Sequence, residues 1–373
     1  MELYTLDAGF RKDVVIDQFV SSIWTERYSA PGDVVLEVEP SSKMVNTLAE
    51  GTFLALDGSQ EVMIVDTLLV ENGKLKVTGK SLLDFLNHRI IRSTTDHEIR
   101  SWIVSMPAGQ MIAHIVNIMC ILGSYPTPAT EAAYSVIPNL SIGEIDMTDP
   151  YIRFDIPFGP AYDPMKTIAD TYEIGMSLYL NSASVNGYSL KFKSYRGRDL
   201  TSDQTTYPLV RFSTRMDTLT DVKELRSISG FKTHCWAYAP QPELWMAEQC
   251  TGFAYAPGAA NLSGFNRRVM QIWVEDLDTK YLTAIDPQTA INVLAGILHN
   301  AARNALANNN YTRVVDGEVV PQNEFRFGTH YLLGDIIELQ GQSEIVQKAR
   351  ITEYIRSQDA TGERSYPTVS LID

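Results

Sequence analysis

Short stretches in which apolar and polar residues alternate recur near both ends of the chain. Alternation with a period of two puts every second side chain on one face of an extended strand. The N-terminal stretches predict five strands, at Val14–Tyr28, Val34–Val38, Gly51–Leu56, Val62–Val70 and Leu75–Val77. Asn72-Gly73 separates the last two, and this dipeptide is the strongest short-range signal for a tight hairpin. Five short strands in so few residues are typical of a small closed barrel, and Ser81 is predicted to cap a helix that leaves it.

A stretch near the C-terminus resembles one of these strand pairs. Glu50–Val62 and Leu333–Ile345 each contain a Gly that opens a strand, alternating apolar residues and a second Gly at the turn. The first glycines, Gly51 and Gly334, are 283 residues apart, since 334 − 51 = 283. Gly suits both places because it tolerates positive φ. Two unrelated hairpins can share this pattern, so the flanking segments decide between chance and duplication.

Those flanking segments follow the same order in both parts of the chain. Val222–Tyr238 corresponds to Val14–Tyr28, because each has a Trp near its end (Trp24, Trp236) and an Ala-Pro soon after. Arg267–Val274 would then match Val34–Val38. The last three strands of the first set have counterparts at Tyr331–Leu339, Ile345–Ile355 and Pro367–Leu371. The shared order predicts an internal duplication with two similar barrels.

Helical periodicity appears between the two β regions. Apolar residues at helical spacing predict a buried helix over Gln110–Leu122. Asp163-Pro164 supplies an N-cap and a first-turn proline for a second helix that Gly175 is expected to stop, and Asp286-Pro287 begins a third that ends near Asn308. Further strands are predicted at Met176–Leu180, Tyr188–Phe192 and Leu209–Phe212.

These patterns together predict an α+β fold that is mainly β. The expected segments are a first barrel at 1–92, an α+β module at 93–215, the first part of a second barrel at 216–280 with an aromatic loop at 240–264, a helical insertion at 281–325, and the last strands of the second barrel at 326–373. The length of 373 residues fits two to three domains.

The net charge of the chain disfavours some classes of binding partner. The net charge is −14 and the pI is about 4.9, and no cluster of Lys and Arg stands out against this balance, which argues against a surface that binds nucleic-acid phosphates. No signal peptide and no apolar run of membrane-spanning length is recognised. Three cysteines, Cys120, Cys235 and Cys250, have no metal-binding spacing and are expected to be free thiols in a reducing cytosol.

No catalytic, cofactor-binding or metal-ligating set is predicted. The six histidines (His88, His97, His114, His234, His299 and His330) show no HExxH pattern, and no GxGxxG, P-loop or GxSxG occurs. His234 and Cys235 are neighbours on a predicted strand, so their side chains should point to opposite faces. Asp276 and Asp278 share one face of an extended segment, yet such carboxylates are usually solvated. His114 is interpreted as a satisfied polar group on a helix, and Gly197-Arg198-Asp199 is too short to be a motif by itself.

The segment Trp236–Phe265 is the least ordinary part of the sequence. It carries Tyr238, Trp245, Phe253 and Tyr255 among Pro, Ala and Gly. Aromatic side chains on a loop can seal a protein interface, stack on sugars or fold back over the open end of a barrel. An interface or a packing role is favoured over sugar binding, because Trp and Tyr concentrate at interfaces.

Several short motifs, taken in order, resemble a known family. They are Tyr28-Ser29-Ala30-Pro31-Gly32-Asp33, Gly79-Lys80-Ser81-Leu82 with Arg89, Gly197-Arg198-Asp199-Leu200-Thr201 followed by Val210-Arg211-Phe212-Ser213, Asn266-Arg267-Arg268, and Phe327-Gly328 with Tyr331-Leu332-Leu333-Gly334-Asp335. The chain is similar to the siphophage tail-hub family, or minor tail proteins, of actinobacterial phages, relatives of the hub of contractile-tail baseplates. The long aromatic loop departs from that pattern, and so does the absence of an appended lytic or sugar-binding domain.

The resemblance implies a structural, non-enzymatic virion protein made in the host cytoplasm and placed at the tail tip. It implies a homotrimer whose two similar barrels per chain adapt a six-fold tail tube to a three-fold tip, and neighbours that include a distal tail ring protein, a tape measure protein and tip or fibre proteins. DNA would pass through its lumen without specific binding. The alternatives are a tail-associated cell-wall hydrolase and a glycan-binding receptor-recognition module.

Overall fold

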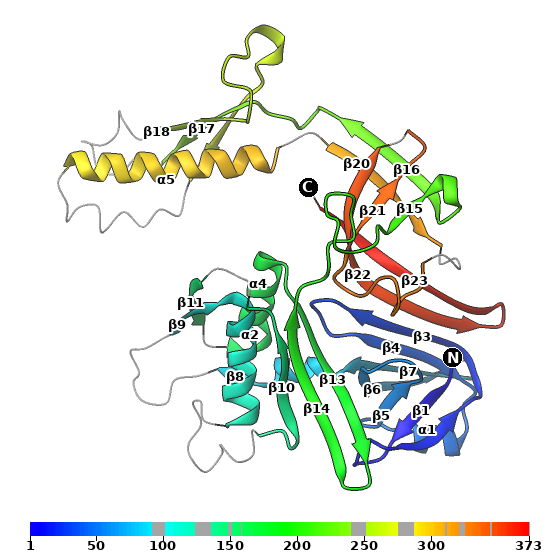
Figure 1. Cartoon of the computed structure of the whole chain (residues 1–373). Helices are drawn as coiled ribbons and strands as arrows, with labels where there is room; N and C mark the ends of the chain where they lie inside the picture. The colour runs from blue at the N-terminus through cyan, green and yellow to red at the C-terminus, as the bar shows by residue number, and fades with distance from the viewer. Residues whose placement is uncertain are drawn as a thin grey trace. The chain divides into compact units, whose positions relative to one another are not determined.

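A computed structural model describes residues 1–91, 101–123, 136–147, 151–157, 159–239, 251–274, 287–309, 312–320, 325–343 and 345–372. The chain divides into two compact units. Unit 1 comprises Met1–Val222 and Gly317–Asp373, and unit 2 comprises Lys223–Asp316. Strands predominate over helices in the described residues, so the predicted mainly β class is confirmed (Figure 1). Two strands near the boundary, β16 (Leu219–Ser227) and β20 (Thr312–Val319), pair with each other.

One eleven-stranded sheet dominates unit 1. Its order is β15-β21-β22-β3-β4-β7-β6-β5-β1-β2, with β23 paired to β22 alone. The strands are β1 (Leu3–Leu6), β2 (Lys12–Ile16), β3 (Phe19–Arg27), β4 (Asp33–Val38), β5 (Phe53–Leu56), β6 (Val62–Glu71), β7 (Lys74–Ser81), β15 (Arg211–Ser213), β21 (Ile336–Gln340), β22 (Val346–Asp359) and β23 (Gly362–Leu371). Because β22 pairs with β3, the first and last strands of the chain belong to one sheet.

The N-terminal strands follow the predicted alternation. Val34, Leu36 and Val38 on β4 are fully buried, and Trp24 on β3 joins the same core. Asn72 and Gly73 both have positive φ, as the tight turn between β6 and β7 requires. The sequence pattern missed the short strand β1, which lies between β5 and β2, and helix α1 (Ser42–Thr47). The division into two barrels and five segments stays a prediction.

The two predicted copies form hairpins with the same hydrogen-bond pattern. The Gly51 amide donates to the carbonyl of Val65, and the Gly334 amide donates to that of Ile351, each at 2.8 Å. The return bonds run from Val65 to Thr52 and from Ile351 to Asp335. The partner strands are offset by 286 residues, since 351 − 65 = 286. The separation of 283 residues between Gly51 and Gly334 therefore does not continue beyond the turn, and the second hairpin is three residues longer.

The expected correspondence of Val222–Tyr238 with Val14–Tyr28 is also wrong at the level of strands. The two strands of this segment, β16 and β17 (His234–Tyr238), belong to two different sheets, whereas β2 and β3 belong to one sheet. Trp236 is 37% exposed, whereas Trp24 is fully buried. Likewise β19 (Val269–Trp273), the expected counterpart of Val34–Val38, pairs with β17 and with none of the C-terminal strands.

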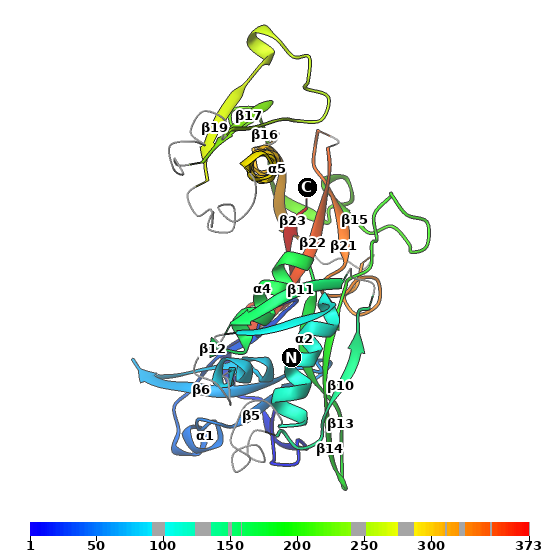
Figure 2. The same ribbon diagram turned by 90° about the vertical axis from the view of Figure 1, so that its left-hand side faces the viewer.

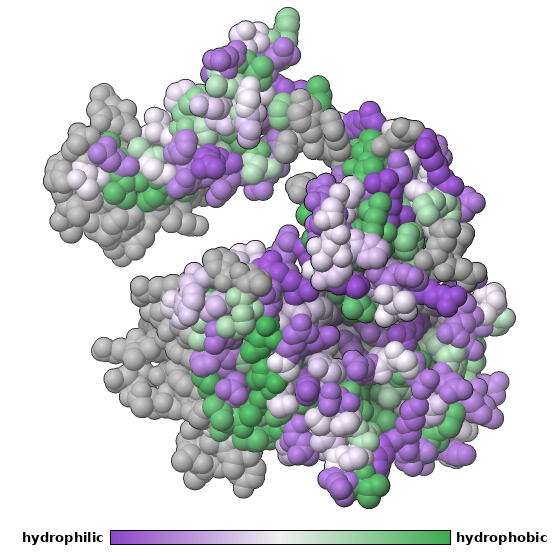
Figure 3. Space-filling view, viewed as in Figure 1, coloured by the Kyte–Doolittle hydropathy of each residue, from purple (hydrophilic) through white to green (hydrophobic). Residues whose placement is uncertain are grey.

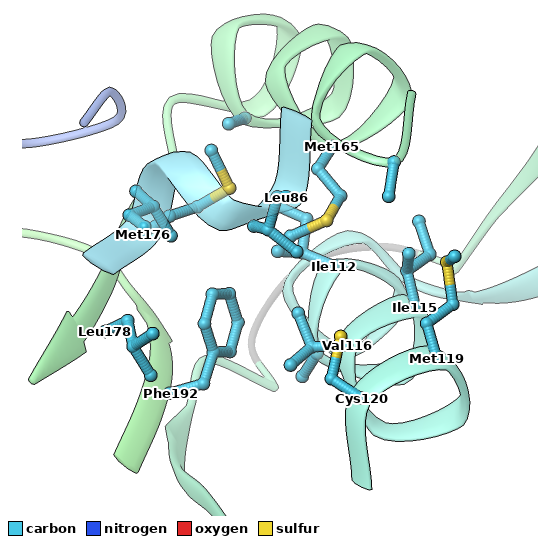
Figure 4. Close-up of a cluster of buried hydrophobic side chains, with 14 of the residues drawn as sticks. Leu86, Ile112, Ile115, Val116, Met119, Cys120, Met165, Met176, Leu178 and Phe192 are labelled. Carbon is cyan, nitrogen blue, oxygen red and sulfur yellow. The ribbon is translucent and has the colours of Figure 1, made fainter. Parts of the chain in front are cut away.

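The segment 93–215, which is predicted to form an α+β module and is called the module below, contains helices and short strands in unit 1. Helix α2 (Ala108–Val116) continues into a π-helical turn (Asn117–Ile121), and α4 (Tyr162–Tyr172) packs against it. The remaining elements are a 3-10 helix (Leu82–His88), β8 (Ile90–Ile91), β9 (Ser101–Pro107), β10 (Leu140–Ile145), β11 (Tyr151–Pro157), β12 (Gly159–Pro160), β13 (Gly175–Ser184), β14 (Gly187–Tyr195) and a 3-10 turn (Thr214–Met216). Figure 4 shows the apolar cluster that joins them, in which Met165, Met176 and Phe192 face α2.

The structure differs from the prediction at three helix caps. Ala161 occupies the N-cap of α4, and Asp163 lies inside its first turn. Glu173, with φ of 56°, ends that helix in a left-handed conformation, two residues before the expected Gly175. The Ser81 hydroxyl accepts a hydrogen bond from the Gly32 amide at 2.9 Å, so it ties two strands together instead of capping the helix that follows.

Unit 2 is a three-stranded sheet covered by one long helix. The order is β18-β17-β19, with β18 at Thr251–Tyr255, and the predicted helix is α5 (Pro287–Ala307). Leu294, Leu298 and Ala302 of α5 pack on Cys235 and Ala237 of β17. A 3-10 turn (Gly264–Asn266) precedes β19. Within the described residues of both units, no helix is long and apolar enough to cross a membrane.

Candidate functional site

The adjacent His234 and Cys235 lie on opposite faces of β17, as predicted. Cys235 is fully buried under α5, and burial raises the pKa of its thiol. The His234 ring stacks on Phe253 with ring centroids 5.7 Å apart, and its Nδ1 lies 2.8 Å from the Thr233 hydroxyl. A thiol with a raised pKa and a histidine on the other face cannot act as a nucleophile and its base.

The other reactive candidates in the described residues are also structural. Cys120 is buried in the module core, and burial raises its pKa to about 12. Burial lowers the pKa of His114 on α2. The described part of the chain contains no group of three or more His, Cys, Asp or Glu side chains placed to hold a metal ion. Trp245, Cys250, Asp276 and Asp278 lie outside the described residues.

Tyr28 marks the point where distant parts of unit 1 meet. Its ring lies between two glycines, because a Cβ on either Gly175 or Gly334 would come within 2.2 Å of the Tyr28 Cε2 atom. Its hydroxyl is 2.9 Å from the carbonyl oxygen of Glu173 and 3.1 Å from that of Tyr195. Tyr28 therefore joins the N-terminal strands to the module and to the C-terminal hairpin.

A second close approach brings Gly197 onto Gly334. A Cβ on Gly197 would lie 1.9 Å from the Gly334 carbonyl, so only a glycine permits this backbone contact. The next residue, Arg198, forms an ion pair with Asp335, whose side chain is 2% exposed. The Asp335 carboxylate accepts hydrogen bonds from the Arg198 backbone amide at 2.7 Å, from Arg198 Nη2 at 2.6 Å and from the Leu332 amide at 2.8 Å.

Another buried carboxylate lies on β21, the strand that begins directly after Asp335. Glu338 on β21 accepts hydrogen bonds from the Ser202 amide at 2.8 Å, the Ser202 hydroxyl at 2.6 Å and Arg211 Nε at 2.6 Å. Burial alone would raise the pKa of Glu338, but these hydrogen bonds and the Arg211 charge outweigh it and lower the pKa. The segment 197–213 is thus fixed to the C-terminal hairpin by two carboxylates.

The contact between the segment 197–213 and the C-terminal hairpin is called the joint below. A cavity of about 470 Å³ lies beside it. Glu26 of β3, Glu61 before β6, Lys193 of β14 and Arg356 of β22 contribute charged groups to its lining. Glu26 and Glu61 are each 8% exposed, and one oxygen of each lacks a hydrogen-bond partner. The Arg356 guanidinium is 3.3 Å from Glu26, and Lys193 Nζ lies 4.3 Å from the centroid of the Tyr195 ring.

Burial shifts the pKa values of these groups. It raises the pKa of Glu26, and together with the charge of Glu26 it raises that of Glu61 well above its ordinary range. Burial lowers the pKa of Lys193. A raised pKa favours the protonated form of a carboxyl, which does not repel a neighbouring carboxylate. The cluster therefore connects the N-terminal strands, the module and the last strands.

The sequence alone pointed to few of these residues. Gly197-Arg198-Asp199 was too short to interpret, although Gly334 was recognised for its strand geometry, and its φ of 89° agrees with that. Tyr28 appeared only as part of a motif that resembles a family, and Glu26 and Glu61 carried no signal, because their roles depend on contacts with residues far away in the sequence.

Comparison with known proteins identifies the family of this chain. A sequence model of the family described as Siphovirus ReqiPepy6 Gp37-like protein matches residues 1–369. The chain belongs to this family. The predicted resemblance to a siphophage family is thereby confirmed, and the match covers both units of the Gp37-like chain. No curated protein matched the sequence.

Solved structures share the fold at low identity. A tail protein from Neisseria meningitidis MC58 is 11% identical with a TM-score of 0.53, and the alignment covers 100% of this chain and 96% of that one. The 43 kDa tail protein of prophage MuSo2 from Shewanella oneidensis is 12% identical (TM-score 0.52; 99% and 98% covered). Prophage tail protein gp18 from Listeria monocytogenes EGD-e is 10% identical (TM-score 0.50; 99% and 94% covered). At these identities the likeness establishes a fold that occurs in phage tail proteins.

Proposed function

We propose that this Gp37-like protein is a structural component of the phage tail, the hub at the tail tip. The observation that carries the proposal is the fold, which spans nearly the whole length of both this chain and three prophage or tail proteins. A family of siphovirus proteins with that fold is most simply understood as part of the virion. Function here rests on fold-level analogy, so it needs its own test.

The matched hairpins support an adapter role. The chain contains two hairpins with one hydrogen-bond pattern, at Gly51 and at Gly334. If each belongs to a similar barrel, three chains present six similar units, which is the number needed to meet a six-fold tube from a three-fold tip. The proposed neighbours are a distal tail ring protein, the tape measure protein and tip or fibre proteins.

The charge distribution supports a passage for DNA. Unit 2 contains eight Lys or Arg and eight Asp or Glu residues, so unit 1 carries the whole net charge of −14. A lumen lined by unit 1 would repel DNA phosphates and let DNA pass without being held. A trimer structure with a lumen lined by Lys and Arg would contradict this part of the proposal.

Location in the virion tests the role. Gold-labelled antibody against the purified chain is expected to mark the distal end of the tail in negatively stained virions. Label along the tube, on the capsid or nowhere on the particle would contradict the hub. Antibody depleted with the purified chain serves as the control.

One observation bears on the hydrolase alternative. Glu26 and Glu61 are two carboxyls with raised pKa values beside one cavity, and paired carboxyls with separated pKa values are used in glycoside hydrolysis. We expect no clearing zone when the purified chain is tested by zymography on peptidoglycan, because both carboxyls are buried and the charged groups around them tie strands together. Clearing that disappears in Glu61→Gln would establish the hydrolase instead.

A further inference from the structure

In the described residues of unit 2, the sheet has one face covered by α5 and one face on which no helix packs (Figure 2). Cys235, Ala237 and Ala254 point towards α5 and are buried. At Gly252 a Cβ would lie 2.3 Å from the Leu298 carbonyl carbon, so α5 packs directly on the strand backbone. Because side chains alternate along a strand, the residues between these positions lie on the opposite face.

That opposite face is rich in aromatic rings. Strand register places Trp236 between Phe253 and Gln271, Tyr238 between Thr251 and Trp273, and His234 between Tyr255 and Val269. We call the five rings on it the aromatic face: Trp236, Tyr238, Phe253, Tyr255 and Trp273. Trp236 is 37%, Tyr255 52% and Trp273 59% exposed.

The rings are held in fixed positions relative to one another. The centroids of Trp236 and Phe253 are 4.6 Å apart, and those of Tyr238 and Trp273 are 5.3 Å apart. The backing helix and the two-sided pairing of β17 fix the strands that carry them. Exposed rings on a rigid support lose little conformational freedom when a ligand binds.

The composition of the face points to a neutral, hydroxylated ligand. The three sets of paired residues on this face contain no Lys, Arg, Asp or Glu. Unit 2 as a whole has no net formal charge. A nucleic acid would need cations for its phosphates. Trp and Tyr also concentrate at protein interfaces, so a protein partner is the competing occupant that the test separates from a sugar. Gln271 and Thr251 stand beside the rings and can bond to hydroxyl groups.

We propose that the aromatic face binds a neutral oligosaccharide, with pyranose rings stacked on Trp236 and Trp273. The apolar C–H faces of a sugar ring lie on an aromatic ring while its hydroxyls reach Gln271 and Thr251. Trp236 and Trp273 lie on adjacent strands and are diagonal to each other, because Trp273 pairs with Tyr238, so one oligosaccharide can contact both rings. The proposal does not depend on the hub role.

The test uses the full chain and a panel of immobilised neutral oligosaccharides (gluco-, manno-, galacto- and chito-oligosaccharides). We expect at least one to bind, with quenching or enhancement of tryptophan fluorescence on titration, and at least tenfold weaker binding in Trp273→Ala and Trp236→Ala. Both side chains are exposed, so thermal unfolding should show that the variants fold. Phe265→Ala is the matched control: Phe265 is fully exposed but lies on the turn before β19, and its loss should leave binding unchanged.

Three results would overturn the inference. Failure of every oligosaccharide to bind the wild-type chain at millimolar concentration excludes the ligand class. Equal binding by the wild type and both tryptophan variants excludes the face. A change in molar mass on substitution of Trp236 or Trp273 would identify the face as a protein interface. None of these results bears on whether the chain lies at the tail tip.

Discussion

Tyr28 and the two glycines on either side of its ring illustrate how single residues hold unit 1 together. The ring fills a space that exists only because Gly175 and Gly334 lack a Cβ, and its hydroxyl bonds to the module. Gly334 also has positive φ. The same residue therefore satisfies two independent demands, a left-handed backbone and a close contact.

Gly51 is a matched control for Gly334, because it has a positive φ but no close contact with Tyr28. Its φ of 84° is close to the 89° of Gly334, but a Cβ on Gly51 would meet nothing within 4 Å. Gly51→Ala should cost about 1–2 kcal/mol of unfolding free energy from backbone strain. Gly334→Ala should cost about 3–5 kcal/mol, because overpacking against Tyr28 is added. Urea denaturation measures both, and equal losses would show that the Tyr28 contact relaxes freely.

The buried Glu61 should make stability depend on pH. Its pKa is raised when folded, so its contribution is fully present below the ordinary glutamate value of 4.5 and is lost as the pH rises through the folded pKa. Glu26 acts in the same direction. Lys193, whose pKa is lowered, acts oppositely at higher pH, nearer its ordinary 10.5.

Thermal unfolding of Glu61→Gln at about pH 5 and about pH 8 tests this dependence. We expect the melting temperature of the wild type to fall more between these values than that of the variant. Glu144→Gln, which alters an exposed carboxyl lining the same cavity, should retain the wild-type fall. An identical fall in the wild type and Glu61→Gln would mean that Glu61 is solvated.

At the scale of elements, the C-terminal hairpin is fixed by the segment 197–213. Asp335 and Glu338 each accept several hydrogen bonds from it, and β15 adds a parallel pairing to β21. Buried carboxylates of this kind are strongly destabilising when a partner is removed. The joint is therefore expected to depend on Arg198 and Arg211 more than on any surface ion pair.

Arg198→Met keeps the aliphatic stem and removes the charge that pairs with Asp335. We expect a loss of about 3 kcal/mol in unfolding free energy, because Asp335 remains buried with only backbone donors. Lys12→Met, whose pair with Asp57 is more than half exposed, should change stability by less than about 0.5 kcal/mol. Similar effects of the two substitutions in chemical denaturation would contradict this account of the joint.

Periodicity predicted the elements well where one face is buried. Alternation located β4 to β7, and helical spacing located α2 and α5, because in each case apolar residues face one core. It failed for Val222–Tyr238, since the local pattern of this segment does not reveal that the chain leaves one sheet and enters another. The joint and the cavity could not be predicted, because they arise from contacts such as Tyr28 with Glu173 that leave no local pattern.

At the scale of the molecule, polarity and charge are unevenly distributed. On the face drawn in Figure 3, hydrophilic and intermediate residues predominate, and one contiguous hydrophobic area lies at the lower left of the view. The charge of −14 belongs to unit 1, whereas unit 2 is neutral and carries the aromatic face. We infer that the two units have different roles, unit 1 in building the hub and unit 2 in contacting a neutral partner.

We propose that the hub is a trimer, and the molar mass of the chain in solution tests this assembly. One chain has a mass of 41.7 kDa, so light scattering on the purified full chain should give three times that value, about 125 kDa. Gly334→Val, which places a bulky side chain against Tyr28, should reduce the trimer fraction or the yield of folded protein. A mass of 41.7 kDa at every concentration up to that used for tail assembly would contradict the hub.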